Sequence, residues 1–347
     1  MTCSFEILDP VVHENWNELL LASPGSSFFH TSNWAAVLQR SYDYRPLYFA
    51  RREAGRLEAL IALMEVRSRL TGTRAVSLPF TDYCEPILTA PDSAQELDDA
   101  IKRHARAARW KYVELRGGEA RASGQVPSAT FYRHVLDISK SENELFSSLR
   151  DSTKRNIKKA AKKGLTLERS RSLAAVSEFY RLHCLTRKGH GLPPQPFHFF
   201  ERIHDHVISA GMGDVITAAH EGKIVAAAVY FHFGREAIYK YGASDKAYQW
   251  LRPNNLVMWD AIKWYAQNGF HSLCLGRTEL HHAGLRQFKV GWGAEERLIR
   301  YFKYDFGRNA YVKETPPTPP RPHHRLMTWM PVPLLRLAGS LLYKHMG

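Results

Sequence analysis

One continuous stretch, residues 239–293, constrains the fold more than any other part of this 347-residue chain. The residues around 237–242 favour a strand, because β-branched and aromatic side chains suit a pleated surface. Residues 252–255 (RPNN) predict a turn and a capped helix start, and Asn268-Gly269 predicts the end of that helix. The next apolar run, residues 270–275, predicts a second strand. This order predicts an α/β unit with Gly276-Arg277 at the carboxyl end of a strand, where open α/β sheets bind ligands.

An internal duplication extends this pattern to the whole chain. Residues 47–62 and 214–227 both read as strand, tight turn and strand. The tetrapeptide Asp-Ala-Ile-Lys then recurs at 99–102 and 260–263, each time on a predicted helix that leads to a short strand. Two similar α/β units are therefore predicted, although any two amphipathic segments of this kind share some residues.

We place these units near residues 5–140 and 145–308. The remaining residues, 309–347, begin with a proline-rich linker at 315–322 and end in a short amphipathic element at 329–345. That element is too short to span a membrane. It is expected either to dock on the body of the protein or to lie on the inner leaflet of a membrane.

The ordered set of motifs resembles the FemAB-type acyltransferases, a family of the GNAT-like superfamily that is related to CelD-like acetyltransferases. The segments that carry the resemblance are Tyr239–Ser244, Leu275-Gly276-Arg277, Phe288-Lys289, Trp292-Gly293-Ala294, the basic segment Leu149–Ala160, Thr186-Arg187 and Ser77–Tyr83. The resemblance covers roughly residues 5 to 305. It implies tandem GNAT-like units, each a mixed sheet flanked by helices, with a cleft between them and the acyl-transfer site in the second unit.

Cysteine usage and the N-terminal sequence indicate the compartment. Cys3, Cys84, Cys184 and Cys274 lie far apart with no Cys-x-x-Cys, which argues against a zinc ribbon and a disulfide framework. The first residues lack the features of a signal peptide, and no apolar run reaches the ~18 residues of a membrane span. We expect a soluble protein of the cytoplasm.

The formal net charge of +14 predicts an anionic partner. Positive charge is densest at Lys154, Arg155 and Lys158 on a predicted helix. Like charges one turn apart destabilise a helix, so a phosphate-bearing ligand is a reasonable counter-charge, although a solvated helix face is the alternative. The candidate partners are aminoacyl-tRNA, a nucleotide-linked or lipid-linked precursor, and an acidic membrane surface.

The loop before the second helix discriminates between acyl donors. Residues 248–255 contain no glycine, and Pro253 has no amide hydrogen, whereas a coenzyme A site of the GNAT type uses a glycine loop to hold pyrophosphate. The resemblance implies the same departure, since several FemAB-type enzymes use aminoacyl-tRNA. No cofactor is firmly implied, and acyl-CoA is the less favoured donor.

The resemblance places Lys289 in the acyl-transfer site, where a cation would stabilise the tetrahedral oxyanion. We therefore expect Lys289→Met to lower turnover and to change stability little, and the alternative is a surface lysine at the start of a strand. Arg277 is the second catalytic candidate, as a ligand of a carboxylate or phosphate, with a structural ion pair as the alternative. The base that removes a proton from the attacking amine could be Asp82, Glu85 or the substrate itself.

Several further residues are candidates for substrate binding. By the resemblance, Arg187 and Lys188 face the acceptor, and the glycines that follow them predict a loop. Tyr83 follows Asp82 in the segment that resembles the family, and Tyr239 and Tyr241 would line the cleft unless they are core residues. The histidines match no metal-binding spacing, so no metal is predicted.

These features together predict an N-acyl or aminoacyl transferase that acts on an amine of a cell-envelope precursor, either peptidoglycan or exopolysaccharide. Two alternatives remain. One is an acyl-CoA-dependent N-acetyltransferase, and the other is a non-catalytic basic module that binds RNA or lipid.

Overall fold

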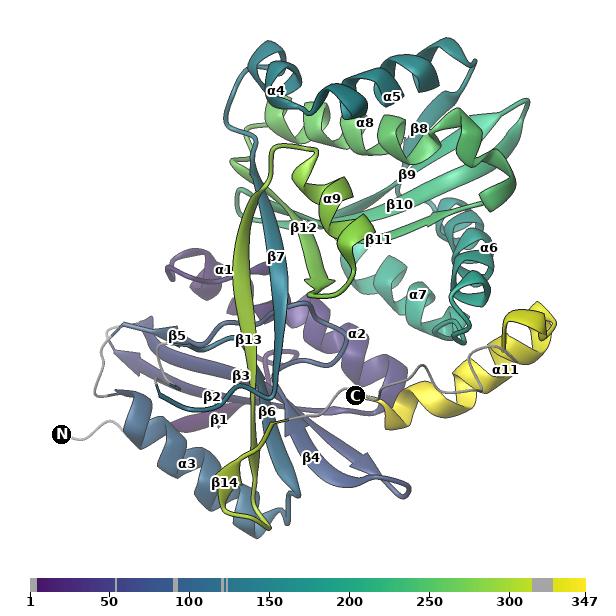
Figure 1. Ribbon diagram of the computed structural model, residues 1–347. Coiled ribbons are helices and arrows are strands. Elements are labelled where there is room, and N and C mark those ends of the chain that lie inside the picture. The colour runs from purple at the N-terminus through teal and green to yellow at the C-terminus, as the bar shows by residue number, and fades with distance from the viewer. Residues whose placement is uncertain (1–4, 54, 90–92, 120–121, 123, 314–326) are drawn as a thin grey trace. The chain divides into compact units, whose positions relative to one another are not determined.

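The computed structural model describes residues 5–53, 55–89, 93–119, 122, 124–313 and 327–347 (Figure 1). The described chain forms two compact units. The first contains the described residues up to Phe131, those from Leu298 to Lys313 and those from Leu342 to Gly347. The second contains Tyr132–Arg297 and the C-terminal residues up to Leu341. The proline-rich segment at 315–322 lies outside the described residues.

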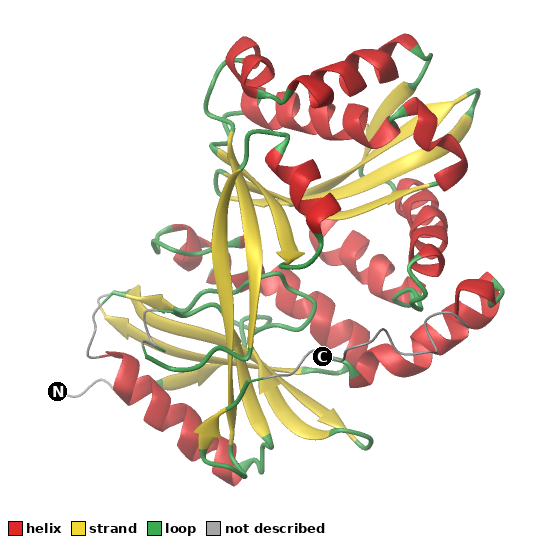
Figure 2. Cartoon of the chain, viewed as in Figure 1, coloured by secondary structure: helices red, strands yellow, loops and turns green. Residues whose placement is uncertain are grey.

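The first unit is a mixed sheet with helices on its faces (Figure 2). Its strands follow the spatial order β1 (Glu6–Leu8), β2 (Arg45–Glu53), β3 (Arg56–Ser68), β4 (Gly72–Val76), β6 (Tyr112–Arg116) and β13 (Glu295–Asp305), with β5 (Ile87–Leu88) on β3 and β14 (Ala310–Tyr311) on β13. Its helices are α1 (Trp16–Leu21), α2 (Ser32–Tyr42) and α3 (Ser93–Ala107), with a 3-10 turn at Phe28–His30. The strands β1 to β4 are antiparallel, whereas β6 runs parallel to β4.

The second unit repeats this plan. Its strands follow the order β8 (Thr166–Ser170), β9 (Gly213–His220), β10 (Lys223–Phe233), β11 (Glu236–Ser244), β12 (Ser272–Glu279) and β7 (Ala129–Asp137). Its helices are α4 (Glu142–Ser148), α5 (Asp151–Lys162), α6 (Leu173–Gly189), α7 (Phe197–Ile203), α8 (Pro253–Gln267), α9 (Ala283–Val290) and α11 (Val332–Leu342), with shorter turns at His204–Ile208, Lys246–Leu251 and Tyr343–His345. Here β8 to β11 are antiparallel and β12 runs parallel to β11.

The predicted duplication is therefore confirmed as two GNAT-like units, each with parallel and antiparallel strand pairs. In each unit a helix that carries the Asp-Ala-Ile-Lys tetrapeptide leads to a strand that pairs in parallel with an earlier one: α3 leads to β6, which pairs with β4, and α8 leads to β12, which pairs with β11. The last strands are exchanged between the units. β7 follows β6 in the sequence but lies next to β12, and β13 follows the second unit but pairs with β6. The predicted domain limits placed residues 298–308 in the second unit, whereas the structure places them in the first. Pairing between strands as distant as β6 and β13 leaves no local sequence pattern.

The apolar face of α8 packs into the hydrophobic core of the second unit. Met258, Ile262 and Tyr265 are buried against Tyr230 of β10 in one hydrophobic cluster. The helix begins at Pro253, which occupies the first helical position, and Arg252 before it has a left-handed φ of 59°. The helix start predicted within residues 252–255 is therefore present without a side-chain cap, and proline suits its first position because the first amide of a helix has no partner within the helix. No described helix is long and apolar enough to cross a membrane.

Candidate active site

Two parallel strands of the second unit separate soon after they meet. β11 and β12 are paired only over Glu236–Ile238 and Ser272–Cys274. Beyond this point Gly276 has a φ of +74°, a conformation that favours glycine. We had expected β12 to end at Gly276-Arg277, but it continues to Glu279 because the glycine bends the strand without ending it.

Lys289 binds the backbone of β12 at Gly276 and Arg277. Its Nζ donates hydrogen bonds to the carbonyl oxygens of Gly276 at 3.0 Å and Arg277 at 2.8 Å. Lys289 is only 4% exposed and lies in the last turn of α9, so the alternative of a surface lysine at the start of a strand is wrong. The helix forms because a His282 ring nitrogen accepts a bond from the Leu285 amide at 3.2 Å and so caps its first turn.

A buried histidine network lies beside this lysine. His134 of β7 is fully buried, and its Nε2 lies 3.1 Å from Oε2 of Glu296. Arg286 donates to both oxygens of Glu296 at 2.7 Å and stacks over the Tyr132 ring at 4.2 Å. Burial lowers the pKa of His134, and the charge of Lys289 lowers it further. No local sequence pattern indicates this network, since a histidine on a strand resembles any core residue.

A pocket of about 620 Å³ in the second unit lies where three helices come together. The first turns of α5 supply most of its wall, and α8 and α9 supply the rest. The lining residues are Arg150–Thr153, Arg155, Asn156, Asn255, Gly284, Gln287 and Phe288. A smaller pocket of about 240 Å³ shares Asn255 and Phe288 and extends along the start of α8. The larger volume suits a small-molecule or nucleotide-sized group, because such pockets span about 300–1,000 Å³.

This pocket is suited to an anion. The N-terminal turns of α5 and α8 face it, and helix N-termini carry partial positive charge and amide donors. The Arg150 and Arg155 side chains add two guanidinium groups, against one carboxylate from Asp151. Because Pro253 has no amide hydrogen, α8 offers one donor fewer than other helices would.

Only part of the predicted basic cluster reaches the pocket. Arg155 lines it. Lys154 instead pairs with Asp151 at 3.5 Å, and the ammonium of Lys158 lies 5.8 Å from the centre of the Phe146 ring. Arg150 was not among the predicted site residues, although it directly precedes the helix.

Arg187 and Lys188 do not lie in a loop. They occupy the last turn of α6, which continues through Gly189. A single glycine is tolerated near a helix end, and cations are favourable there because the helix C-terminus is partly negative. The Arg187 Nε donates to the Pro193 carbonyl at 3.2 Å and so ties down the segment after the helix.

Tyr239 and Tyr241 belong to different environments. A bulge in the pairing of β10 with β11 separates them, so that Tyr239 packs on the cluster around α8. Burial raises the pKa of Tyr239 to about 12. Its hydroxyl would lie only 1.6 Å from a Cβ at Gly242, which explains the glycine. Tyr241 packs instead against Phe200 at 5.5 Å, in the aromatic cluster of α6 and α7.

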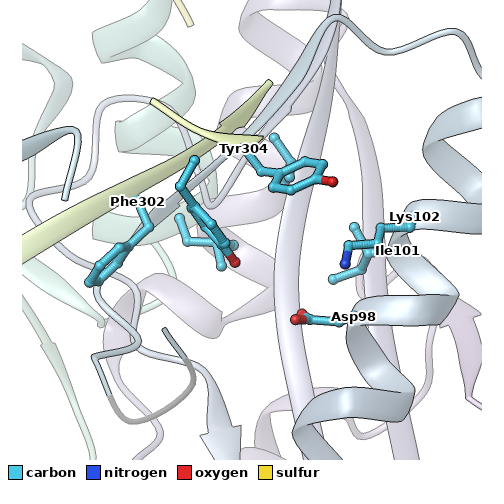
Figure 3. A pocket seen from close by; sticks show the side chains of 8 residues that line it. Asp98, Ile101, Lys102, Phe302 and Tyr304 are labelled. Carbon is cyan, nitrogen blue, oxygen red and sulfur yellow. The ribbon is translucent and has the colours of Figure 1, made fainter. Parts of the chain in front are cut away.

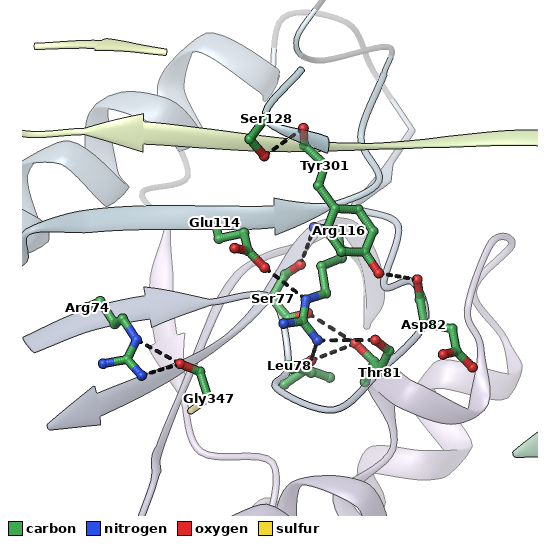
Figure 4. A network of polar contacts seen from close by, with 10 residues as sticks. All are labelled: Arg74, Ser77, Leu78, Thr81, Asp82, Glu114, Arg116, Ser128, Tyr301 and Gly347. Carbon is green, nitrogen blue, oxygen red and sulfur yellow. Dashed lines mark hydrogen bonds and ion pairs between the residues drawn. The ribbon is translucent and has the colours of Figure 1, made fainter. Parts of the chain in front are cut away.

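The segment 77–83 of the first unit is held in a strained conformation (Figure 4). Leu78 and Phe80 have φ values of 58° and 62°, which non-glycine residues rarely adopt. Arg116 stabilises the turn, because its Nη1 donates to the carbonyls of Leu78 at 3.3 Å and Thr81 at 3.1 Å. Strain of this kind persists at functional segments.

The remaining predicted residues lie in and next to that segment. The backbone carbonyl of Asp82 accepts a bond from the Tyr301 hydroxyl at 2.6 Å. Tyr83 is buried against Phe29, with ring centres 5.6 Å apart, which favours a core role. The Glu85 carboxylate accepts from the Gly118 amide at 2.6 Å. The use of Asp82 or Glu85 as a base stays a prediction.

In the first unit a pocket of about 320 Å³ lies beside Glu119 and Arg300. A cavity of about 10 Å³ under α3, between Asp98, Lys102 and Tyr304, has room for about one water molecule (Figure 3). Among the described residues no group of three His, Cys, Asp or Glu side chains is placed to hold a metal ion.

Comparison with known proteins agrees with this geometry. Residues 147–296 match the family model described as the acetyltransferase (GNAT) domain, and this range contains every residue that lines the larger pocket. No curated protein matches the sequence. The crystal structure of FemX has a TM-score of 0.68 and 15% identity, and the alignment covers 84% of this chain and 95% of that one.

Two further solved structures share the fold. A tandem GNAT protein from the clavulanic acid biosynthesis pathway has a TM-score of 0.53 and 11% identity, over 87% of this chain and 98% of that one. The L-PGS structure from Bacillus licheniformis has a TM-score of 0.55 and 13% identity, over 87% and 94%. These similarities show a tandem GNAT-like fold, and the family match covers the acetyltransferase (GNAT) domain of the second unit.

Proposed function

We propose that this acyltransferase of GNAT-like fold transfers an acyl or aminoacyl group to an amine of a cell-envelope precursor, either peptidoglycan or exopolysaccharide. The observation that carries the proposal is the pocket of about 620 Å³ at the N-terminal turns of α5 and α8, with Arg150 and Arg155 in its wall. The C-terminal domain of a putative lysylphosphatidylglycerol synthetase from Agrobacterium fabrum shares the fold, which favours aminoacyl transfer.

The donor that fits best is an aminoacyl-tRNA. Its 3′ end carries phosphates for the helix N-termini and the arginines, and its bases can stack on Phe288, which is partly exposed in the pocket wall. The net charge of +14 suits a polyanion of that size. Acyl-CoA is the second candidate, because the matching family model is that of acetyltransferases.

The chemistry requires one bond to form and one to break. The acceptor amine attacks the ester carbonyl, the tetrahedral oxyanion collapses, and the ribose hydroxyl leaves with a proton while the amine loses one. We place Lys289 and Arg277 near this step. The charge of Lys289 lies where β11 and β12 separate, and it favours a developing oxyanion there. The Arg277 guanidinium would bind a substrate carboxylate or phosphate.

The anionic pocket gives a direct prediction. Arg150→Gln/Arg155→Gln should weaken the binding of tRNA by roughly tenfold or more at low salt and reduce the salt slope by roughly 1.5, because two phosphate contacts are lost. Titration of tRNA at several salt concentrations, with coenzyme A titrated in parallel, measures both quantities.

The matched control is Lys159→Gln/Lys162→Gln, which removes the same charge from exposed positions of the same helix outside the pocket. It should change the binding of tRNA much less. Equal losses of tRNA binding in both variants would mean that binding depends on general surface charge and not on the pocket. Binding of coenzyme A that exceeds that of tRNA and disappears in the pocket variant would favour the acyl-CoA alternative.

We also propose that the protein works in the cytoplasm, where tRNA is charged. Contact with the inner face of the membrane through residues 329–345 is a separate proposal, argued next.

A further inference from the structure

The C-terminal helix α11 is fixed on the second unit by one face. Leu335 is fully buried, and the Arg336 guanidinium lies 5.3 Å from the centre of the Tyr180 ring. At Gly339 an added Cβ would lie 2.0 Å from the Pro194 carbonyl oxygen. The helix therefore packs on backbone so closely that only glycine fits, and its orientation on the unit is set by that contact.

The opposite face of α11 is apolar and exposed. Leu334, Leu337 and Leu341 are 53%, 57% and 60% exposed. Their spacing of three and four residues places them on one side of the helix. Trp329, just before the helix, is 84% exposed. We name these four residues the α11 stripe. Packing on the protein does not explain it, and contiguous apolar surface of this kind marks an interaction site.

The charge of the surrounding sequence indicates what covers the stripe. Residues 315–347 contain no Asp or Glu, but they contain Arg321, Arg325, Arg336 and Lys344. An apolar helix face with tryptophan, in a segment that carries only cations, is the pattern of helices that lie in the surface of anionic membranes. Each cation near such a surface adds attraction to lipid phosphates.

We propose that the α11 stripe docks on a membrane surface that contains anionic lipids. The leucines enter the boundary between head groups and acyl chains, Trp329 lies at head-group level, and the positive charge of the segment attracts it to the anionic surface. The two expectations for the C-terminal element, docking on the body and lying on a membrane, then describe its two faces. The inference does not depend on the proposed transfer reaction, although it would bring the enzyme to a lipid-linked acceptor.

The test uses the full chain and vesicles of phosphatidylcholine with and without phosphatidylglycerol. Cosedimentation should show binding to the anionic vesicles, little binding to neutral ones, and weakening at high salt. Leu334→Ser/Leu337→Ser/Leu341→Ser should reduce binding by roughly tenfold or more, because three inserted side chains are lost. Leu337→Glu should also reduce binding, and its single change keeps the test valid if the triple variant folds poorly.

The control removes three exposed apolar side chains elsewhere. Leu21, Leu70 and Val126 are 57%, 71% and 54% exposed, and their replacement by Ser should leave vesicle binding unchanged. Full binding by both the triple variant and Leu337→Glu would overturn the proposal, as would equal binding to neutral vesicles. The proposal would also be overturned if neither protein bound vesicles, and if the wild type were a dimer and the triple variant a monomer. The stripe would then be assigned to contact with a second copy of the chain.

Discussion

Replacement of Lys289 by Met will lower both the stability and the turnover of the protein. The ammonium donates to the Gly276 and Arg277 carbonyls from a site that is 4% exposed. Its loss leaves these acceptors without that partner, so the free energy of unfolding should fall by about 2–4 kcal/mol. The sequence alone predicted little change in stability, because it did not reveal these two bonds.

Turnover should fall by roughly 10²–10³ at a temperature where the variant is still folded, the range for loss of one oxyanion-stabilising group. Urea denaturation measures the first effect, and single-turnover kinetics measure the second. Lys159→Met, an exposed lysine of α5, is the control and should change neither. A destabilised variant with normal turnover would restrict Lys289 to a structural role, and unchanged stability would mean that the two bonds contribute little.

Acid should unfold this protein at a pH where many proteins remain folded. His30 of the first unit is buried, and its Nε2 lies 2.9 Å from the Glu85 carbonyl while its Nδ1 accepts from the Ser27 amide at 3.1 Å. Burial lowers the pKa of His30 to about 4 and that of His183, in the second unit, to about 3. Both rings are therefore neutral in the native state at pH 5.

The direction in which stability changes with pH follows from proton uptake on unfolding. The unfolded chain binds a proton at each histidine below a pKa of about 6.5, whereas the native state does not, so stability falls as the pH falls. Each residue should remove about 3 kcal/mol between pH 7 and pH 4. Their sum approaches the whole stability of a typical domain, about 5–15 kcal/mol.

Urea midpoints measured from pH 7 to pH 4 test this prediction. His183→Gln should flatten the profile, because an amide can still contact Gln195, the partner 3.1 Å from the His183 Nε2, but does not titrate. His30→Gln should do the same for the first unit. Variant profiles that run parallel to the wild type would contradict the assignment of the acid sensitivity to these two rings.

Local patterns were sufficient for much of the second unit. The segment from 237 to 275 forms the predicted strand, helix and strand, and Gly269, with a φ of +77°, follows the helix that Asn268-Gly269 was expected to end. These features depend on period, caps and turn residues, which act over a few residues. The duplication could be recognised for the same reason, since each repeat carries its own hairpin and helix.

The site was harder to predict because its contacts join distant residues. His134 meets Glu296 across 162 positions, and Lys289 binds backbone carbonyls, which no side-chain pattern can reveal. Arg155 rather than Lys154 lines the pocket, although both belong to one basic run. Which face of α5 points to the pocket depends on packing against α8, and a run of cations around a helix does not specify it.

The central claim is that the pocket at the start of α5 and α8 accepts a charged tRNA as acyl donor. The most direct test incubates the purified protein with an amine-bearing envelope precursor and either aminoacyl-tRNA or acetyl-CoA, and follows the mass of the precursor. We predict that the precursor gains an aminoacyl group from the charged tRNA alone, and that Arg150→Gln/Arg155→Gln removes most of this gain. Transfer of an acetyl group from acetyl-CoA, or donor binding with no transfer from either, would contradict the claim.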